Sequence, residues 1–186
     1  MATPAACPPS LDAFKLNGLH EFETLCRLVE AILLLTDLLT IDRIKIPLQS
    51  DTKEDVLREL VQVITQNNGV TEPDEVLRAV REREAVLSTG IGNGVAIPHG
   101  KSALVADLVM AAGRTASPVE FDSLDGRPVR LLFMLVGPET AAGPHIKALS
   151  RISRLIRRDD VRDQLINAKT AEEFYQGLKE AEAVTG

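Results

Sequence analysis

Apolar residues recur every three or four positions in several segments of the chain, a spacing that predicts helices with one buried face. The clearest stripe covers residues 56–64, and Ser50 or Thr52 can cap the start of this helix. Thr170 and Glu173 form a second capping pair, which predicts the start of a helix near the end of the chain. Including that one, four further helices are expected over residues 71–84, 144–157, 161–168 and 171–180.

Short apolar runs bounded by turn residues predict strands between these helices. Ile44, Ile46 and Leu48 alternate with other residues, as in a half-buried strand. Three more strands, buried or half-buried, are expected over residues 95–98, 108–112 and 129–136. Strands interleaved with helices predict an α/β sandwich.

The beginning of the chain has a different character. Residues 1–18 are rich in alanine and proline and lack apolar periodicity, which favours a disordered lead-in. Residues 19–35 have helical spacing and predict an amphipathic helix that packs on the domain or on a second copy. We therefore interpret residues 1–36 as an extension. The two cysteines, Cys7 and Cys26, lack the spacing of a zinc site and indicate incidental thiols of a reducing compartment.

The composition argues against several classes of partner. The 27 acidic and 21 basic residues give a net charge of -6, which opposes the phosphate attraction that nucleic-acid binding requires. Aromatic residues make up 3% of the chain, so stacking platforms for bases or sugars are scarce. The most apolar stretch, residues 28–41, contains two acidic residues and is shorter than the roughly twenty apolar residues of a membrane-spanning helix. We expect a cytoplasmic protein with no nucleic-acid partner and no membrane insertion.

The most informative segment is residues 88–100, S-T-G-I-G-N-G-V-A-I-P-H-G. A dinucleotide loop needs a strand before its glycines and a helix after them, whereas here a predicted helix comes first and a strand follows. The run can instead offer backbone amides to an anion, as a phosphate-approach loop of Gly90, Gly92, Asn93 and Gly94. The strand then presents His99 between a proline and a glycine. A lone histidine is more often held in a core or loop by a backbone hydrogen bond, so the context decides.

That context resembles a known family. The segment, with Arg83 before it and residues 144–149 (P-H-I-K-A-L) after it, resembles the type-2 enzyme IIA (EIIA) domains of the bacterial phosphotransferase system, the fructose, mannitol and nitrogen-related class. The resemblance implies a domain over residues 37–183, a three-layer α/β/α sandwich with a mixed, mostly parallel sheet. It also implies that His99 accepts a phosphoryl group from an HPr-type phosphocarrier protein. An EIIB domain or a regulatory target protein would be the next partner.

The resemblance gives three side chains a role. We expect Nδ1–H of His99 to donate to a nearby carbonyl, which leaves Nε2 free to form tele-phosphohistidine. His145 would donate a hydrogen bond to the phosphoryl oxygens, and the alternative is a solvated histidine at a helix start. Arg83 would bind the same oxygens with its guanidinium, and the alternative is pairing with Glu82 or Glu84 on a solvated helix.

The remaining candidates are weaker. His20 lies outside the resemblance and is interpreted as structural or exposed. Four arginines near the third-last helix could dock an acidic partner, but a solvated face is the more common meaning: Arg151, Arg154, Arg157 and Arg158. The motifs of metallopeptidases, thiol-redox proteins, serine hydrolases and P-loop kinases are missing, so we expect no metal and no cofactor.

Two biological uses remain open for such a phosphocarrier. One is a relay that passes phosphate to a separate EIIB domain for fructose or mannitol transport. The other is a regulatory switch of the nitrogen-related branch, which a free-standing domain without a permease segment favours. A binding module that has lost phosphotransfer is disfavoured, because both histidines and the arginine are present.

Overall fold

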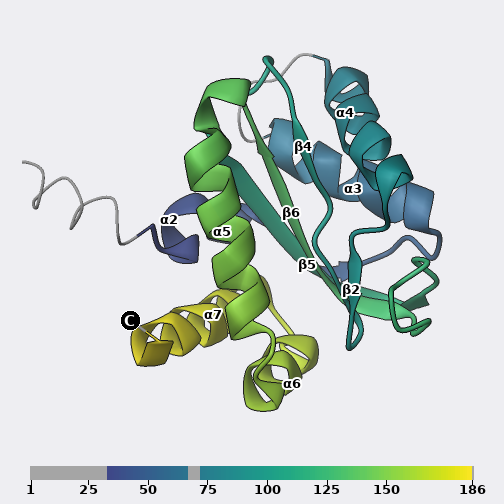
Figure 1. Cartoon of the computed structure of the whole chain (residues 1–186). Coiled ribbons are helices and arrows are strands. Elements are labelled where there is room, and N and C mark those ends of the chain that lie inside the picture. Colours follow the sequence, from purple (N-terminus) through teal and green to yellow (C-terminus); the bar gives the residue numbers. More distant parts are fainter. Residues whose placement is uncertain (1–32, 67–71, 186) are drawn as a thin grey trace, which may run out of the picture. The chain divides into compact units, whose positions relative to one another are not determined.

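The computed structural model describes residues 33–66 and 72–185, and the chain from Leu34 onward forms one compact unit. In that unit a sheet lies between two layers of helices (Figure 1). None of the described helices is long and apolar enough to cross a membrane. Several predictions fall outside the described residues: the lead-in over 1–18, most of the helix over 19–35, Cys7, Cys26 and His20.

The helices and strands follow one another in an α/β order. They are α2 (Leu35–Leu38), η1 (Ile41–Arg43), β1 (Ile44–Leu48), α3 (Lys53–Gln66), α4 (Pro73–Val86), β2 (Gly90–Gly92), β3 (Val95–Ala96), β4 (His99–Lys101), β5 (Val109–Val119), β6 (Val129–Gly137), η2 (Glu139–Ala141), α5 (Ala142–Leu155), α6 (Asp159–Asn167) and α7 (Ala171–Thr185).

The sheet has the strand order β1-β5-β6-β3-β2, and β4 also pairs with β6. Three pairings are parallel, β1 with β5 and both β3 and β4 with β6. The pairings of β2 with β3 and of β5 with β6 are antiparallel. The prediction of a mixed sheet is confirmed, although β5 and β6, the two longest strands, run antiparallel.

The side chains of β6 show why helices cover both faces. Leu132 and Met134 join the apolar core that α3 and α4 complete. Phe133, between them, points to the opposite face, where its ring centroid lies 5.9 Å from that of Phe174 on α7. A strand buried on both faces is a continuous apolar run, which explains the uninterrupted sequence of β6. The predicted three-layer architecture is therefore confirmed.

The strand that leads to His99 differs from the prediction. A single strand was expected over residues 95–98, but β3 ends at Ala96 and β4 begins at His99, and both pair with β6. Proline has no N–H to donate to a sheet, so the ladder is interrupted at Pro98, whose carbonyl accepts from Leu135 N at 3.0 Å. His99 thus lies within a strand rather than after one. The strand expected over 108–112 likewise extends further, to Val119.

The helix caps agree with the sequence. Thr52 Oγ1 accepts from the Asp55 amide at 3.2 Å, so Thr52 rather than Ser50 caps α3. Thr170 Oγ1 accepts from the Glu173 amide at 3.2 Å at the start of α7. Both helices therefore begin where the capping residues predicted.

The start of the described unit is tied to its last helix. Leu35 is fully buried, and its amide donates to the Glu182 carboxylate at 2.7 Å. The Thr36 amide and hydroxyl donate to the same carboxylate at 3.1 and 3.0 Å, and Arg151 pairs with it at 2.7 Å. The predicted boundary between residues 36 and 37 would cut α2. The contacts of Leu35 and Thr36 place both residues with the domain.

Candidate functional site

Three predicted residues from distant segments line one cavity of about 430 Å³. Arg83 comes from the last turn of α4, His99 begins β4, and His145 lies in the first turn of α5. Among the described strands β4 pairs only with β6, so its outer side is free to face α4. The sheet edge therefore brings these side chains together.

Gly100 allows β4 to approach α4 closely. A Cβ atom at this position would lie 3.0 Å from the Val80 backbone nitrogen and 3.1 Å from the Ala79 carbonyl carbon. Backbone atoms cannot move aside as a flexible side chain can, so any larger residue would push the strand away from the helix. Since Arg83 lies one turn further along α4, this close approach brings its guanidinium within reach of His99.

The hydrogen bonds of His99 fix its tautomer. Nδ1 lies 2.8 Å from the Ile97 carbonyl oxygen, which can only accept, so Nδ1 carries the hydrogen. Nε2 lies 3.1 Å from Arg83 Nε, which can only donate, so Nε2 carries a lone pair. The carbonyl expected from the sequence is that of Ile97. Both contacts favour the same neutral imidazole.

The surroundings of His99 also favour the neutral ring. Burial lowers the pKa of His99 below its ordinary value, and the charge of Arg83 lowers it further. The Ile97 hydrogen bond and the Glu84 carboxylate oppose this shift without reversing it. His99 is consequently neutral at physiological pH, with its Nε2 lone pair available once Arg83 releases it.

His145 is buried beside His99. Its side chain is 4% exposed, and the two rings meet edge to face with centroids 5.6 Å apart. Burial, and next the charges of His99 and Lys101, lower the pKa of His145 to about 4. Neither ring nitrogen has a hydrogen-bond partner among the described residues. A buried polar group of this kind is suited to a ligand that supplies the missing acceptor.

Arg83 is directed at His99 rather than at the neighbouring carboxylates. Besides the bond to His99, its Nη1 donates to the Leu87 carbonyl at 2.9 Å. Glu82 pairs with another arginine of α4, and Glu84 pairs with a lysine of α3. The alternative in which Arg83 pairs with Glu82 or Glu84 therefore does not describe this arrangement.

The glycine run lies elsewhere. Gly90 belongs to β2, and the next turn leads back into β3 as a hairpin with positive φ angles of 96° at Gly92, 54° at Asn93 and 73° at Gly94. The Asn93 amide donates to the Asp125 carboxylate at 2.8 Å. None of these four residues lines the cavity of His99. The geometry explains the glycines by the turn and does not support the predicted phosphate-approach loop.

Two polar groups near His99 were not singled out in the sequence, the Lys101 side chain and the Ile97 carbonyl. Lys101 lines the cavity and pairs with Glu139 at 2.7 Å. The alternation of side chains along a strand could have indicated Lys101, because residues two apart share a face with His99. The Ile97 carbonyl could not have been singled out, because its position depends on the interruption of the strand at Pro98.

The arginines proposed as a docking face do not act as a group. Arg151 is engaged with the buried Glu182 carboxylate, and Arg158 pairs with a nearby aspartate. Arg154 and Arg157 are exposed. Only part of the predicted cluster is thus available on the surface.

Comparison with known proteins decides the family. Residues 37–181 match the family model of the phosphoenolpyruvate-dependent sugar phosphotransferase system, EIIA 2. The chain belongs to this EIIA 2 family. The resemblance seen in the sequence is therefore confirmed.

Relatives of this EIIA 2 domain come from both branches of the family. A fructose-specific EIIABC component of Bacillus subtilis is 40% identical over 73% of this chain, but the match spans only 21% of that protein. A nitrogen regulatory protein of Bradyrhizobium diazoefficiens is 36% identical over 77% of this chain and 94% of its own length. This domain also resembles the crystal structure of the nitrogen regulatory protein IIA-Ntr from Neisseria meningitidis, with a TM-score of 0.73 and 33% sequence identity. The match covers 77% of this chain and 98% of the Neisseria chain.

The buried His145 makes the stability of this EIIA 2 domain depend on pH. The unfolded chain protonates this histidine near pH 6.5, whereas the folded domain resists protonation down to about pH 4. The free energy of unfolding should fall by up to about 3 kcal/mol across this window. Replacing His145 by Gln should remove this part of the pH dependence in urea unfolding followed from neutral pH to about pH 4. If the variant loses stability between pH 6.5 and about pH 4 as steeply as the wild type, the lowered pKa of His145 is not the cause of the pH dependence.

Proposed function

We propose that this EIIA 2 domain carries a phosphoryl group on Nε2 of His99. The supporting observation is the fixed tautomer of His99, which lines the cavity. The Ile97 carbonyl accepts from the protonated Nδ1, so Nε2 has the lone pair of a nucleophile. The donor is an HPr-type phosphocarrier protein, as the family resemblance implies. In the transfer an N–P bond forms at His99 Nε2 while the donor's N–P bond breaks, and the donor nitrogen keeps the electron pair.

Arg83 has two roles in this reaction. Its Nε–H covers Nε2 in the free domain, so this hydrogen bond breaks when phosphorus approaches. The guanidinium then lies beside the incoming phosphoryl oxygens and donates to them, because its planar set of N–H groups suits phosphate geometry. The bond to the Leu87 carbonyl holds the side chain close during this change.

His145 supplies a neutral donor to the same oxygens. With its pKa lowered to about 4, the ring is uncharged and one of its nitrogens carries an N–H. A donor that is already buried and oriented costs little reorganisation when charge develops in the transition state. Lys101, which lines the cavity, adds positive charge near the phosphoryl group.

We infer a regulatory use, in which phosphorylation changes binding to target proteins. It is supported by two nitrogen regulatory relatives, each 36% identical to this chain and matched over 94% and 92% of their own length. A fructose-specific EIIA component is matched over 84% of its length at 34% identity, so the preference rests on the higher identity of the nitrogen branch. The alternative, a transport relay, hands its phosphate to a separate EIIB domain.

The first test compares two of the three histidines of the chain. His99→Ala should abolish acid-labile phosphorylation by a phosphorylated HPr-type donor, because His145, the other histidine that the structure describes, has no hydrogen bond that fixes its tautomer. His20→Ala, outside the family match, should label like the wild type. Circular dichroism should show both variants folded. Full labelling of His99→Ala would refute the assignment of the acceptor.

The second test separates the two uses. Labelled protein is isolated from its donor and mixed with a purified EIIB domain of the fructose class. As a control, a fructose-specific EIIA protein is labelled and mixed with the same EIIB domain. A regulatory protein should keep its label long after the control has transferred its phosphate. Rapid discharge onto the EIIB domain, at the rate of that control, would instead establish the transport relay.

A further inference from the structure

We propose that Glu84 is a positioning residue for Arg83. Glu84 clamps the loop after α4, and a carbonyl of that loop orients the guanidinium over His99. The inference rests on the proposed function of His99, since it assigns the residue that prepares the site for phosphate.

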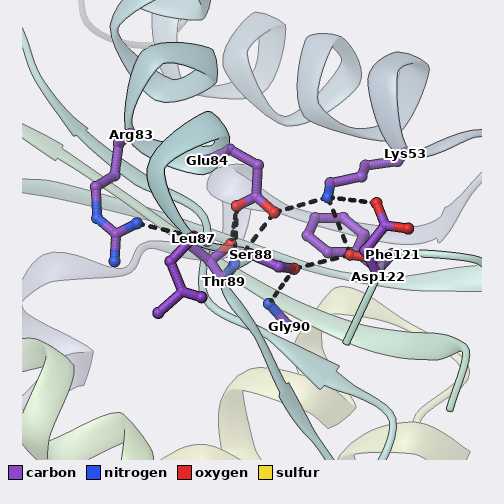
Figure 2. A network of polar contacts seen from close by, with 9 residues as sticks. All are labelled: Lys53, Arg83, Glu84, Leu87, Ser88, Thr89, Gly90, Phe121 and Asp122. Atoms are coloured by element: carbon purple, nitrogen blue, oxygen red, sulfur yellow. Dashed lines mark hydrogen bonds and ion pairs between the residues drawn. The ribbon is translucent and has the colours of Figure 1, made fainter. Parts of the chain in front are cut away.

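The clamp is a buried carboxylate held on both sides. Glu84 is 8% exposed and lies in the last turn of α4. Its two oxygens accept from the Thr89 amide at 3.1 and 3.0 Å, and one also accepts from the Thr89 hydroxyl. Lys53 Nζ lies 2.8 Å from the other side of the carboxylate (Figure 2). Glu84 thereby joins α3, the end of α4 and the residue just before β2.

Lys53 is itself held in place. Its ammonium group donates to the Phe121 carbonyl at 3.0 Å and to Asp122 at 3.1 Å, and it lies 4.8 Å from the centre of the Phe121 ring. Ser88 donates to the same Phe121 carbonyl at 2.8 Å and accepts from the Gly90 amide. Figure 2 shows these contacts as one connected network. Lys53, which pairs with Glu84, and Ser88 of the loop are thus both tied to the segment after β5.

This network controls the position of the Leu87 carbonyl. The side chains of Val86 and Leu87 are 80% and 59% exposed, so packing of these side chains cannot hold the loop. The Leu87 carbonyl lies between the end of α4 and the clamped Thr89, and it accepts from Arg83 Nη1 at 2.9 Å. Arg83 Nε then reaches His99 at 3.1 Å. In Figure 2 Arg83 and Glu84 leave the helix in different directions, one toward Leu87 and the other toward Lys53.

An arginine side chain has many rotamers, and ordering it costs conformational entropy. Two fixed acceptors, the Leu87 carbonyl and His99 Nε2, select the rotamer that the transfer uses. A buried ion pair is a weak source of stability by itself, because desolvation offsets the attraction. The pairing of Glu84 with Lys53 is therefore better explained by the geometry it imposes on Arg83.

The chain contains a matched control. Glu59 on α3 is 7% exposed, pairs with Lys45 at 2.8 Å, and accepts from the amides of Gln49 and Ser50 and from the Ser50 hydroxyl. The chemistry is that of Glu84, but Glu59 joins α3 to the end of β1 and does not line the cavity of His99. Loss of either carboxylate removes the same kinds of contact.

The kinetic test compares Glu84→Gln with Glu59→Gln. Glu84→Gln should lower kcat for phosphoryl uptake about tenfold or more and leave KM for the phosphorylated donor nearly unchanged, as loss of a preorganised donor does. Glu59→Gln should leave kcat unchanged, although urea unfolding should show a comparable loss of stability. In an Arg83→Ala background Glu84→Gln should cause no further loss of kcat, because its effect acts through Arg83. Equal effects of the two Gln variants, or full additivity with Arg83→Ala, would overturn the proposal.

A spectroscopic readout is independent of phosphorylation. The hydrogen bond from Arg83 Nε to His99 Nε2 should give a nitrogen–nitrogen scalar coupling in 15N-labelled protein. The coupling should be present in the wild type and in Glu59→Gln and lost in Glu84→Gln. If Glu84→Gln does not fold, Thr89→Val takes its place, with loss of the coupling expected and its persistence overturning the proposal. Wild-type protein that shows the coupling but takes no phosphate would refute the proposed function and leave the clamp standing.

Discussion

The hydrogen bond from His99 Nδ1 to the Ile97 carbonyl is the contact on which the proposed chemistry of this domain depends. It exists because the chain beside β6 is interrupted at Pro98 and then resumes as β4. The carbonyl two residues before the histidine accepts from its ring, and the second nitrogen accepts from Arg83 beside the cavity. A change of tautomer would reverse which nitrogen can act as a nucleophile. Sheet geometry therefore determines reactivity.

The rest of the site adds charge and hydrogen-bond donors around that nitrogen. Gly100 lets α4 approach β4, which brings Arg83 to His99, and α5 contributes a buried His145 whose pKa is far below the ordinary value. Such groups are costly to bury in a free protein, and they are useful where negative charge must be received. These groups lie at one edge of the sheet, whereas the side chains on the two faces of β6 pack in ordinary apolar cores.

Part of this could be predicted from the sequence. The stripe on α3, the apolar run of β6 and the caps Thr52 and Thr170 depend on local spacing, and they predicted elements that the structure contains. The resemblance supplied the three residues that converge on the cavity. The role of the glycine run could not be decided from the sequence, because a glycine that permits a turn and one that admits an anion look alike there. The contact of Glu84 with Lys53 depends on packing between α3 and α4, which no local pattern contains.

The identity of the phosphorylated ring nitrogen tests the central claim most directly. The chain is labelled with 15N histidine, phosphorylated by an HPr-type donor and studied by 31P and 15N NMR. The account predicts phosphorus on Nε2 of His99, with Nδ1 still protonated against the Ile97 carbonyl. Phosphorus on Nδ1 of His99, or on either nitrogen of His145, would contradict it.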